Sequence, residues 1–258
     1  MIRYPEFVGR VAIVTGAGSG IGRAAACAFA RNGAQVVVSD IDDEAGAETV
    51  RLIEAAGGEA TYRHCDVALL ADHQAAVAFA ESRYGGLDYA FNNAGAVAPK
   101  VPLAATTEQM FDLIIAVNVR GLAAAMGCQI AAMTARGGGA IVNNASTLAH
   151  VGLAGRAVYA GSKGSVVAMS RGAAVDCGPA NIRVNAISAG TTDTGEMRPL
   201  FDEIADKPER QAAVRAMQVV NRWAQPEEIA EPVLFLCSEG ASYITGTSLA
   251  VDGGFTSR

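Results

Sequence analysis

Tyr159 and Lys163 stand four residues apart in the segment AVYAGSKGSVV, among small and apolar neighbours. Residues at positions i and i+4 of a helix lie on one face, about one turn apart. A phenol with a pKa of about 10 is a poor base near neutral pH, and a nearby ammonium lowers that pKa by stabilising the phenolate. The pair is therefore either an ordinary surface Tyr and Lys or a phenol tuned for proton transfer.

Ser146 precedes Tyr159 by 13 residues and follows an apolar segment that is predicted to be a strand. A hydroxyl at a strand end can hold a substrate oxygen and stabilise the charge that develops on it. Taken alone, Ser146 is a serine that merely ends a strand. The nearby tyrosine is what favours a catalytic role for it.

A glycine-rich turn, TGAGSGIGRA, follows the first apolar segment and opens a helical one. Glycine accepts positive φ and lets the backbone approach a pyrophosphate, while the helix N-terminus offers N–H donors. A tight strand-to-helix turn is also glycine-rich on steric grounds alone, so only the surrounding sequence can distinguish a cofactor-binding turn from an ordinary one. The predicted cofactor residues of this turn are Gly16, Ser19, Gly20, Ile21 and Gly22.

Asp40 supplies that context, because it ends the second apolar segment, 18 residues beyond Gly22. An acid at this place accepts hydrogen bonds from the ribose hydroxyls of NAD and repels the 2′-phosphate of NADP. Neither Ser19 nor Ile41 offers a compensating cation. The alternative is that Asp40 caps the helix beginning at DDEAG. We predict NAD as the cofactor.

Short β-branched segments alternate with longer, Ala-rich ones along the chain. This alternation implies parallel strands joined by right-handed helical crossovers, and the nearly continuous apolar strands are expected to be covered on both faces. We predict a single α/β domain over 1–258, with a doubly wound parallel seven-stranded sheet flanked by helices. The strands are expected at 11–15, 35–40, 59–65, 87–93, 139–146, 182–188 and 248–254, and the helices at 20–32, 43–56, 70–84, 106–134, 157–178 and 226–237.

One region, at about 190–225, breaks the alternation. It is long, charged and proline-containing, and it follows the carboxyl end of a predicted strand. It is either surface decoration or a mobile substrate loop. Its position favours the substrate loop, since long loops in compact domains are often functional.

The composition excludes several classes of protein. With 18% charged residues, a net charge of −6 and no basic run, nucleic acid and anionic membranes are poor partners. The five cysteines form no C-x-x-C pair and the three histidines show no ligand spacing, so no metal site is expected. The N-terminus shows no signal-peptide pattern, and no apolar run is expected to reach membrane-spanning length. These features predict a cytoplasmic protein.

The chain resembles the short-chain dehydrogenase/reductase family with a single Rossmann domain. The resemblance runs over nearly the whole length, and the motifs follow one another in the family's order. They are TGAGSGIG (15–22), CDV (65–67), NNAG (92–95), NVRG (118–121), Ser146, YAGSK (159–163) and NAISAG (185–190).

The resemblance implies roles for individual residues. The catalytic set would be Asn118, Ser146, Tyr159 and Lys163. Tyr159 would be the general acid/base, Lys163 would also hold the nicotinamide ribose, and Asn118 would organise a helix kink and a proton-relay water. Beyond the glycine turn and Asp40, the implied cofactor residues are Asp66 and Val67 at the adenine, Asn93, Ala94 and Gly95, Tyr159 and Lys163, and Thr192 and Thr194 at the carboxamide.

Two positions depart from the family pattern. Ala189 stands where the family usually has proline, which removes a fixed φ and is expected to loosen the turn near the nicotinamide. Ala145 stands where relatives often carry a second serine, so Ser146 is left as the hydroxyl for the substrate oxygen.

The substrate side is expected to be apolar. Its predicted residues are Ser146, Leu148, Leu153 and Met197, with Val97, Phe201 and Trp223 as further candidates. Such a site suits a cyclic or hydrophobic secondary alcohol or its ketone. Arg156 and Arg198 are the candidates for receiving an acidic group.

These observations predict an NAD-dependent oxidoreductase that interconverts a secondary alcohol and its ketone. One alternative is an NADP-linked 3-oxoacyl-carrier-type reductase, which Asp40 argues against. Another is a catalytically silent dinucleotide-binding sensor or scaffold, which the complete catalytic set argues against. The helices 106–134 and 157–178 are apolar around much of their circumference, which indicates a partner on one side. The resemblance implies that these helices form one interface and the C-terminal strand a second, and we therefore expect a homotetramer.

Overall fold

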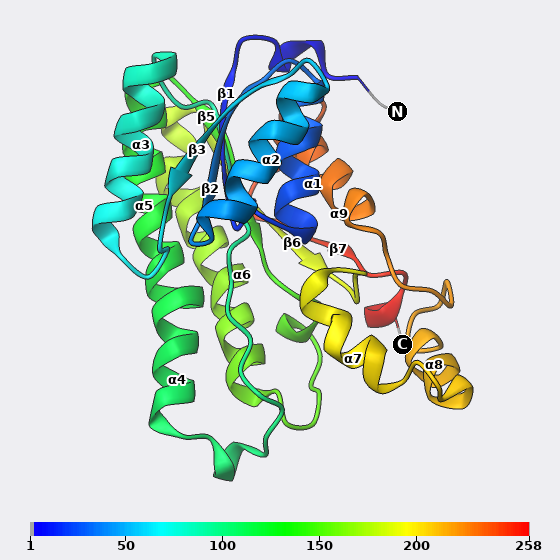
Figure 1. Ribbon diagram of the computed structural model, residues 1–258. Helices are drawn as coiled ribbons and strands as arrows, with labels where there is room; N and C mark the ends of the chain where they lie inside the picture. The colour runs from blue at the N-terminus through cyan, green and yellow to red at the C-terminus, as the bar shows by residue number, and fades with distance from the viewer. Residues whose placement is uncertain (1–2, 258) are drawn as a thin grey trace.

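Seven parallel strands form one sheet in the order β3-β2-β1-β4-β5-β6-β7, which confirms the predicted doubly wound architecture (Figure 1). Every strand pair is parallel. The computed structural model describes residues 3–257, apart from the side chains of 196 and 198–200; the candidate side chain of Arg198 thus lies outside the described residues. The strands are β1 (Val11–Thr15), β2 (Gln35–Asp40), β3 (Glu59–His64), β4 (Tyr89–Asn92), β5 (Gly139–Asn144), β6 (Ile182–Ala189) and β7 (Ser248–Val251).

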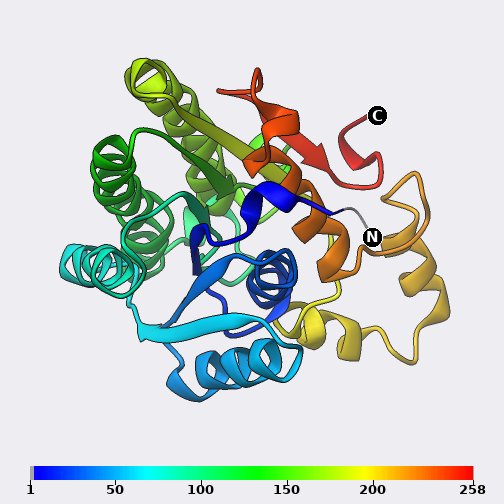
Figure 2. The ribbon, with the colours of Figure 1, turned by 90° about the horizontal axis from the view of Figure 1, so that it is seen from above.

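Helices cover both faces of the sheet, as Figure 2 shows from above. The helices of one face are α1 (Gly20–Arg31), α2 (Asp43–Ala55) and α9 (Pro226–Cys237). The helices of the other face are α3 (Leu70–Tyr84), α5 (Leu122–Arg136) and α6 (Ala157–Cys177). All six correspond to predicted helices. Five of them begin and end within two residues of the predicted bounds, and the sixth, α5, is part of a predicted helix that is divided.

Burial on both faces explains why the strands read as continuous apolar runs. Successive side chains of β2 enter opposite cores, with Val36 and Val38 packed in the α1 core and Val37 in the α3 core. All three are fully buried. Full burial of a valine contributes about 1.5–3 kcal/mol to stability, and β2 contributes buried valines to both cores.

The predicted helix 106–134 is longer and is divided. It spans Glu108–Arg136 as α4 (Glu108–Ile115), a π-helical turn at Ala116–Gly121, and α5. Thr107 caps its start by accepting a hydrogen bond from the Met110 N–H at 3.3 Å. By length and composition alone it could cross a membrane, contrary to our expectation from the sequence, but its inner face packs into the α3 core through Leu122 and Met133.

The 190–225 insertion contains two helices that the sequence analysis did not predict, α7 (Arg198–Glu203) and α8 (Pro208–Arg215). They lie beyond the carboxyl edge of the sheet (Figure 1). α8 buries none of its residues, so it has no apolar stripe by which a helix could be recognised. Phe201 and Trp223 stack instead, with ring centroids 4.0 Å apart.

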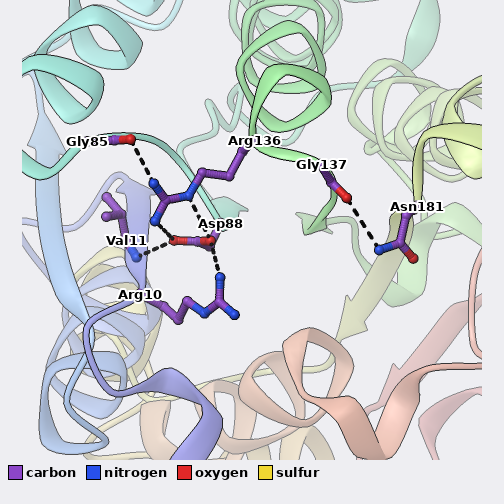
Figure 3. Close-up of polar contacts among 7 residues, drawn as sticks. All are labelled: Arg10, Val11, Gly85, Asp88, Arg136, Gly137 and Asn181. Atoms are coloured by element: carbon purple, nitrogen blue, oxygen red, sulfur yellow. Dashed lines mark hydrogen bonds and ion pairs between the residues drawn. The ribbon is translucent and has the colours of Figure 1, made fainter.

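An ion cluster closes the opposite, amino end of the sheet (Figure 3). Asp88 accepts hydrogen bonds from the Val11 N–H at 2.9 Å, from Arg10 Nη1 at 3.0 Å and from Arg136 Nε at 3.2 Å. These contacts join the starts of β1 and β4 to the end of α5. They hold the scaffold at the end away from the candidate site.

Candidate active site

The candidate residues gather at the carboxyl ends of β1, β4 and β5, at the centre of the sheet. From β1 the chain adds β2 and β3 on one side of the sheet, and it then returns to add β4 to β7 on the other side, so the order of strands switches between β1 and β4. In open α/β sheets ligands bind at such a switch point, in the crevice beyond the strand ends. Gly16, Asn93 and Ser146 each follow one of these strands within two residues.

Residues other than glycine would be strained at several positions of the glycine turn. Gly16 and Gly20 have φ of 63° and 50°. A β-carbon at Gly16 would lie 2.9 Å from the Cα of Ala94, and one at Gly18 would lie 2.8 Å from Asp40 Oδ2. Ser19, the N-cap of α1, makes no side-chain capping hydrogen bond. The turn therefore fits a pyrophosphate against the N–H groups that begin α1.

Asp40 is oriented toward this turn. Its Oδ2 accepts a hydrogen bond from the Gly18 N–H at 2.7 Å, and its Oδ1 accepts one from the Asp42 N–H at 3.0 Å. Asp42, rather than Asp40, caps α2, since its side chain accepts from the Ala45 N–H at 3.0 Å. The capping alternative for Asp40 is thus wrong.

Arg23 brings a cation to the turn that the sequence analysis missed. Its Nη2 donates to the Gly18 carbonyl and its Nε donates to Thr49 Oγ1 at 2.9 Å. The expectation that the turn carries no nearby cation is therefore corrected. Its place in the first turn of α1 was the available signal, because side chains there lie over the helix N-terminus.

Hydrogen bonds fix the loop after β3, where Asp66 and Val67 lie. Asp66 Oδ1 accepts from the Ala68 N–H at 2.9 Å, and Nε2 of His73 pairs with the Val67 carbonyl at 2.9 Å. Burial lowers the pKa of His73, which favours a neutral imidazole donating to that carbonyl. These two bonds fix the positions of Asp66 and Val67 after the end of β3.

A second set of contacts supports the acid-bearing end of β2. Tyr62 Oη donates to Asp43 Oδ1 at 2.6 Å and also lies 2.8 Å from the Asp40 carbonyl oxygen. Partial burial, and then the bond to Asp43, raise the pKa of Tyr62. His64 Nδ1 lies 2.7 Å from the same Asp43 oxygen, and this bond raises the pKa of His64.

The NNAG segment joins the turn to the catalytic set. Thr15 Oγ1 accepts hydrogen bonds from the N–H groups of Asn93 and Ala94, at 3.1 and 3.2 Å. A β-carbon at Gly95 would lie 3.3 Å from Lys163 Nζ and 3.4 Å from Asn118 Oδ1. The structure therefore brings these predicted cofactor and catalytic residues into one corner.

Asn118 lies in the π-helical turn and is buried. Its Oδ1 accepts from the Ala96 N–H at 2.8 Å, and its Nδ2 donates to the Ala96 carbonyl at 2.9 Å and to Ser162 Oγ at 3.0 Å. A π-helical turn aims a side chain differently from regular α-helix, and such turns are frequent at functional sites. Here it connects the NNAG segment to α6.

Tyr159 and Lys163 share one face of α6. Lys163 is only 5% exposed, its Nζ donates to the Asn144 carbonyl at 2.7 Å, and it lies 5.8 Å from the centroid of the Tyr159 ring. Ser146 is 9% exposed and its Oγ accepts from the Leu148 N–H at 3.2 Å. An ammonium in this low-dielectric position acts on the phenol far more strongly than a solvated one would.

A groove beside Tyr159 is the candidate substrate side. Its lining residues are Ala98, Pro99, Val101, Thr106, Met110, Gly155, Arg156, Ala157, Val158 and Tyr159. The predicted substrate residues Ser146, Leu148, Leu153 and Met197 are outside this lining, and so are the further candidates Val97, Phe201 and Trp223. The segment 98–110 was missed, although its place after the NNAG motif at a strand end was a usable signal. Arg156 Nη1 donates to the Ala98 carbonyl at 2.6 Å.

The segment after β6 packs over the glycine turn. A β-carbon at Gly20 would lie 3.0 Å from Thr194 Cγ2, whereas Thr192 Oγ1 donates to the Gly190 carbonyl at 3.0 Å. Ala189 pairs with Val251 across β6 and β7, and the next N–H donates to the Val251 carbonyl at 2.9 Å. The sheet thus holds the turn that the missing proline was expected to loosen.

Comparison with known proteins establishes the family. The family model described as enoyl-(acyl carrier protein) reductase matches residues 16–256. The chain is 41% identical over 252 residues to 2,5-dichloro-2,5-cyclohexadiene-1,4-diol dehydrogenase of Sphingobium indicum, covering 97% of this chain and 98% of that one. It is 37% identical over 253 residues to cyclohexanol dehydrogenase of Acinetobacter sp., covering 98% and 97%.

Solved structures agree. A 7α-hydroxysteroid dehydrogenase complexed with NADH and a 7-oxo bile acid has a TM-score of 0.91 and 34% identity, with 98% of each chain covered. A Beutenbergia cavernae protein described as an NAD(P)-dependent gluconate 5-dehydrogenase, with NADP at low occupancy, has a TM-score of 0.89 and 36% identity, with 97% and 98% covered. The chain belongs to the short-chain dehydrogenase/reductase family, and it is an oxidoreductase that uses a nicotinamide dinucleotide.

Proposed function

We propose that this protein is an NAD-dependent dehydrogenase of cyclic secondary alcohols, with Tyr159 as its general acid/base. The observation that carries the proposal is the buried ammonium of Lys163, 5.8 Å from the Tyr159 ring and beside Gly95 and Asn118. We further propose a cytoplasmic homotetramer of single-domain subunits, in which 190–225 is the substrate loop.

The side chains divide the work of proton transfer among them. Tyr159 takes the hydroxyl proton of the alcohol, or returns it to the ketone oxygen, and Lys163 stabilises the phenolate form. Ser146 holds the substrate oxygen. Asn118 holds the segment after β4 against α6 through its bonds to Ala96 and Ser162. A bound nicotinamide dinucleotide supplies the hydride acceptor or donor.

Two observations support the choice of NAD over NADP. Asp40 faces the glycine turn through the Gly18 N–H, where a 2′-phosphate would meet its carboxylate. The guanidinium of Arg23 is bound to Thr49 through Nε and to the Gly18 carbonyl through Nη2, which turns these two donors toward the protein. The relatives do not decide the question, because structures with NADH and with NADP are both similar to this chain.

The substrate class rests on the relatives, and the residues around the groove beside Tyr159 agree with it. Val101, Met110 and Val158 make much of the groove apolar, and Arg156 adds a cation to its rim. Two relatives are named for six-membered ring alcohols. We propose a ring alcohol as the substrate. The Arg156 guanidinium would favour a ring that also carries a polar group.

The test is a panel of secondary alcohols assayed with NAD at the NADH absorbance. The panel should contain cyclohexanol, cyclopentanol, 1,4-cyclohexanediol and a linear alcohol. We expect turnover with the ring alcohols and a loss of at least a thousandfold in kcat for Tyr159→Phe, with NADH binding within twofold of the wild type.

Two results would overturn the proposal. The first is full activity of Tyr159→Phe. The second is turnover confined to NADPH and a 3-oxoacyl thioester, with no ring alcohol oxidised. A protein that binds NADH but turns over neither class would be a silent sensor or scaffold.

A further inference from the structure

Two neighbouring strands end in the same dipeptide. Asn92 is the last residue of β4 and Asn93 follows it, Asn143-Asn144 closes β5, and Asn92 is paired in register with Asn143. Because successive side chains of a strand point to opposite faces, this register places one pair of amides on each face of the sheet.

On the α5 and α6 face the amides form a buried chain. Asn92 Nδ2 donates to Asn143 Oδ1 and to Gln129 Oε1, both at 2.9 Å, and Gln129 Nε2 donates back to Asn92 Oδ1 at 2.7 Å. Asn143 Nδ2 donates to Ser170 Oγ on α6 at 2.8 Å. All four residues are 6% exposed or less. This face ties the strand ends to α6, the helix of Tyr159 and Lys163.

On the other face the amides reach the cofactor turn. Asn144 Nδ2 donates to Asn93 Oδ1 at 2.9 Å, and Asn93 Nδ2 donates to the carbonyls of Thr15 and Gly16, both at 3.1 Å. The Asn144 main-chain carbonyl accepts the hydrogen bond of Lys163 Nζ at 2.7 Å. Asn144 therefore connects to the glycine turn through its side chain and to Lys163 through its backbone.

The amide of Asn144 is costly to bury. Its Oδ1 is buried without a hydrogen-bond partner among the residues that the structure describes. Buried polar atoms are nearly always paired, and an apolar side chain here would leave no bare acceptor. Packing alone does not explain an asparagine at this position, whereas the bond to Asn93 does.

We propose that Asn144 is a positioning residue, which fixes the glycine turn relative to Lys163 without contacting cofactor or substrate. The inference rests on the proposed function, because that function gives the turn and the lysine their roles. Without the amide, Asn93 Oδ1 loses a donor and Asn93 is free to reorient. The carbonyls of Thr15 and Gly16 then lose the partner that holds the turn.

The experiment measures dinucleotide affinity and kcat separately in Asn144→Leu and in the smaller Asn144→Ser. The reduced dinucleotide, NADH or NADPH, is the one that the wild type binds more tightly, and binding is followed by its fluorescence. We expect its Kd to rise about five- to tenfold in both variants, with a lower kcat. Ser170→Ala is the matched control, since it cuts the amide chain on the opposite face. It should lower the Tm and leave the Kd within twofold.

An unchanged Kd in a folded Asn144 variant, with only a lower Tm, would overturn the inference. So would an equal rise of the Kd in Ser170→Ala, because the effect would then be general loosening of the strand ends. If Asn144→Leu does not fold, Asn144→Ser gives the answer. The proposed function is tested separately. It is wrong if the wild type oxidises no ring alcohol, and the dinucleotide affinities of the Asn144 variants remain interpretable in that case.

Discussion

At the scale of single residues, Asp40 and Asp42 offer a controlled test of cofactor choice. Asp40 ends β2 and faces the glycine turn, whereas Asp42, two residues later, caps α2. Asp40→Ala removes the charge opposed to a 2′-phosphate. We expect the ratio of kcat/KM for NAD to that for NADP to fall at least tenfold, as measured by initial rates with both cofactors.

Asp42→Ala should leave that ratio unchanged. The loss of an N-cap costs about 1 kcal/mol, so this variant should show a lower Tm and no change of cofactor preference. An Asp40→Ala enzyme with the wild-type ratio would contradict the assignment of Asp40, and so would an equal change of the ratio in both variants.

Motif spacing predicts which residues reach the site, but not the partners that hold them. Local periodicity places the glycine turn, Asp40 and Ser146 near strand ends and Tyr159 and Lys163 on one helix face, whereas the family resemblance supplied Asn118 and the remaining cofactor residues. The bond between Arg156 and the Ala98 carbonyl joins residues 58 positions apart, and that between Asn144 and Asn93 joins residues 51 apart. Such contacts depend on how the strands are ordered in the sheet, which no local pattern contains.

At the scale of elements, burial decides what could be predicted. The inner strands were predicted because they are apolar along most of their length, and the main helices because each covers the sheet; β3, an edge strand with the sequence EATYRH, is partly exposed and largely polar. α8 was missed since no residue of it is buried. The kink that the family resemblance implied at Asn118 is a π-helical turn, which helical periodicity alone does not show; here the chain packs closely on a distant segment, since a β-carbon at Gly121 would overlap the Val67 carbonyl.

The 190–225 insertion is held by an aromatic contact that can be removed. Phe201 stacks on Trp223, and the Arg215 guanidinium lies 5.2 Å from the centroid of that indole. Phe201→Ala removes the stack, and the insertion should close less well over the alcohol. We expect the KM for the ring alcohol to rise three- to tenfold while the KM for NAD stays within twofold, because the glycine turn is unaffected.

Arg210→Ala is the matched control for this element. It removes an exposed ion pair with Glu203 on the same insertion, and exposed pairs of this kind contribute little to stability. Both KM values should stay at the wild-type level. Trp223 is the only tryptophan of the chain, so its emission also reports on the insertion directly. Equal KM values in Phe201→Ala and the wild type would exclude 190–225 as a substrate loop.

At the scale of the whole molecule, α6 has an outer face that suits a second copy of the chain. Gly161, Gly164 and Gly172 have no atom within 4 Å of the position that a β-carbon would take. Glycine inside a helix costs about 0.5–1 kcal/mol relative to alanine, and within one subunit nothing at these positions requires it. A helix from another subunit that packs closely on this face would require it, which supports the proposed tetramer.

Gly172→Leu tests this assembly without harming the subunit. Leucine is a far better helix former than glycine, and the space beyond Gly172 is open in one subunit, so the variant should fold with an unchanged circular dichroism spectrum. On an interface the added side chain would hold the helices apart. We expect light scattering at micromolar protein to give four times the chain mass for the wild type and a smaller assembly for Gly172→Leu. Ala47→Leu, on the exposed side of α2, should keep the wild-type mass. A wild-type monomer, or a Gly172→Leu protein that assembles like the wild type, would exclude this face of α6 as the interface.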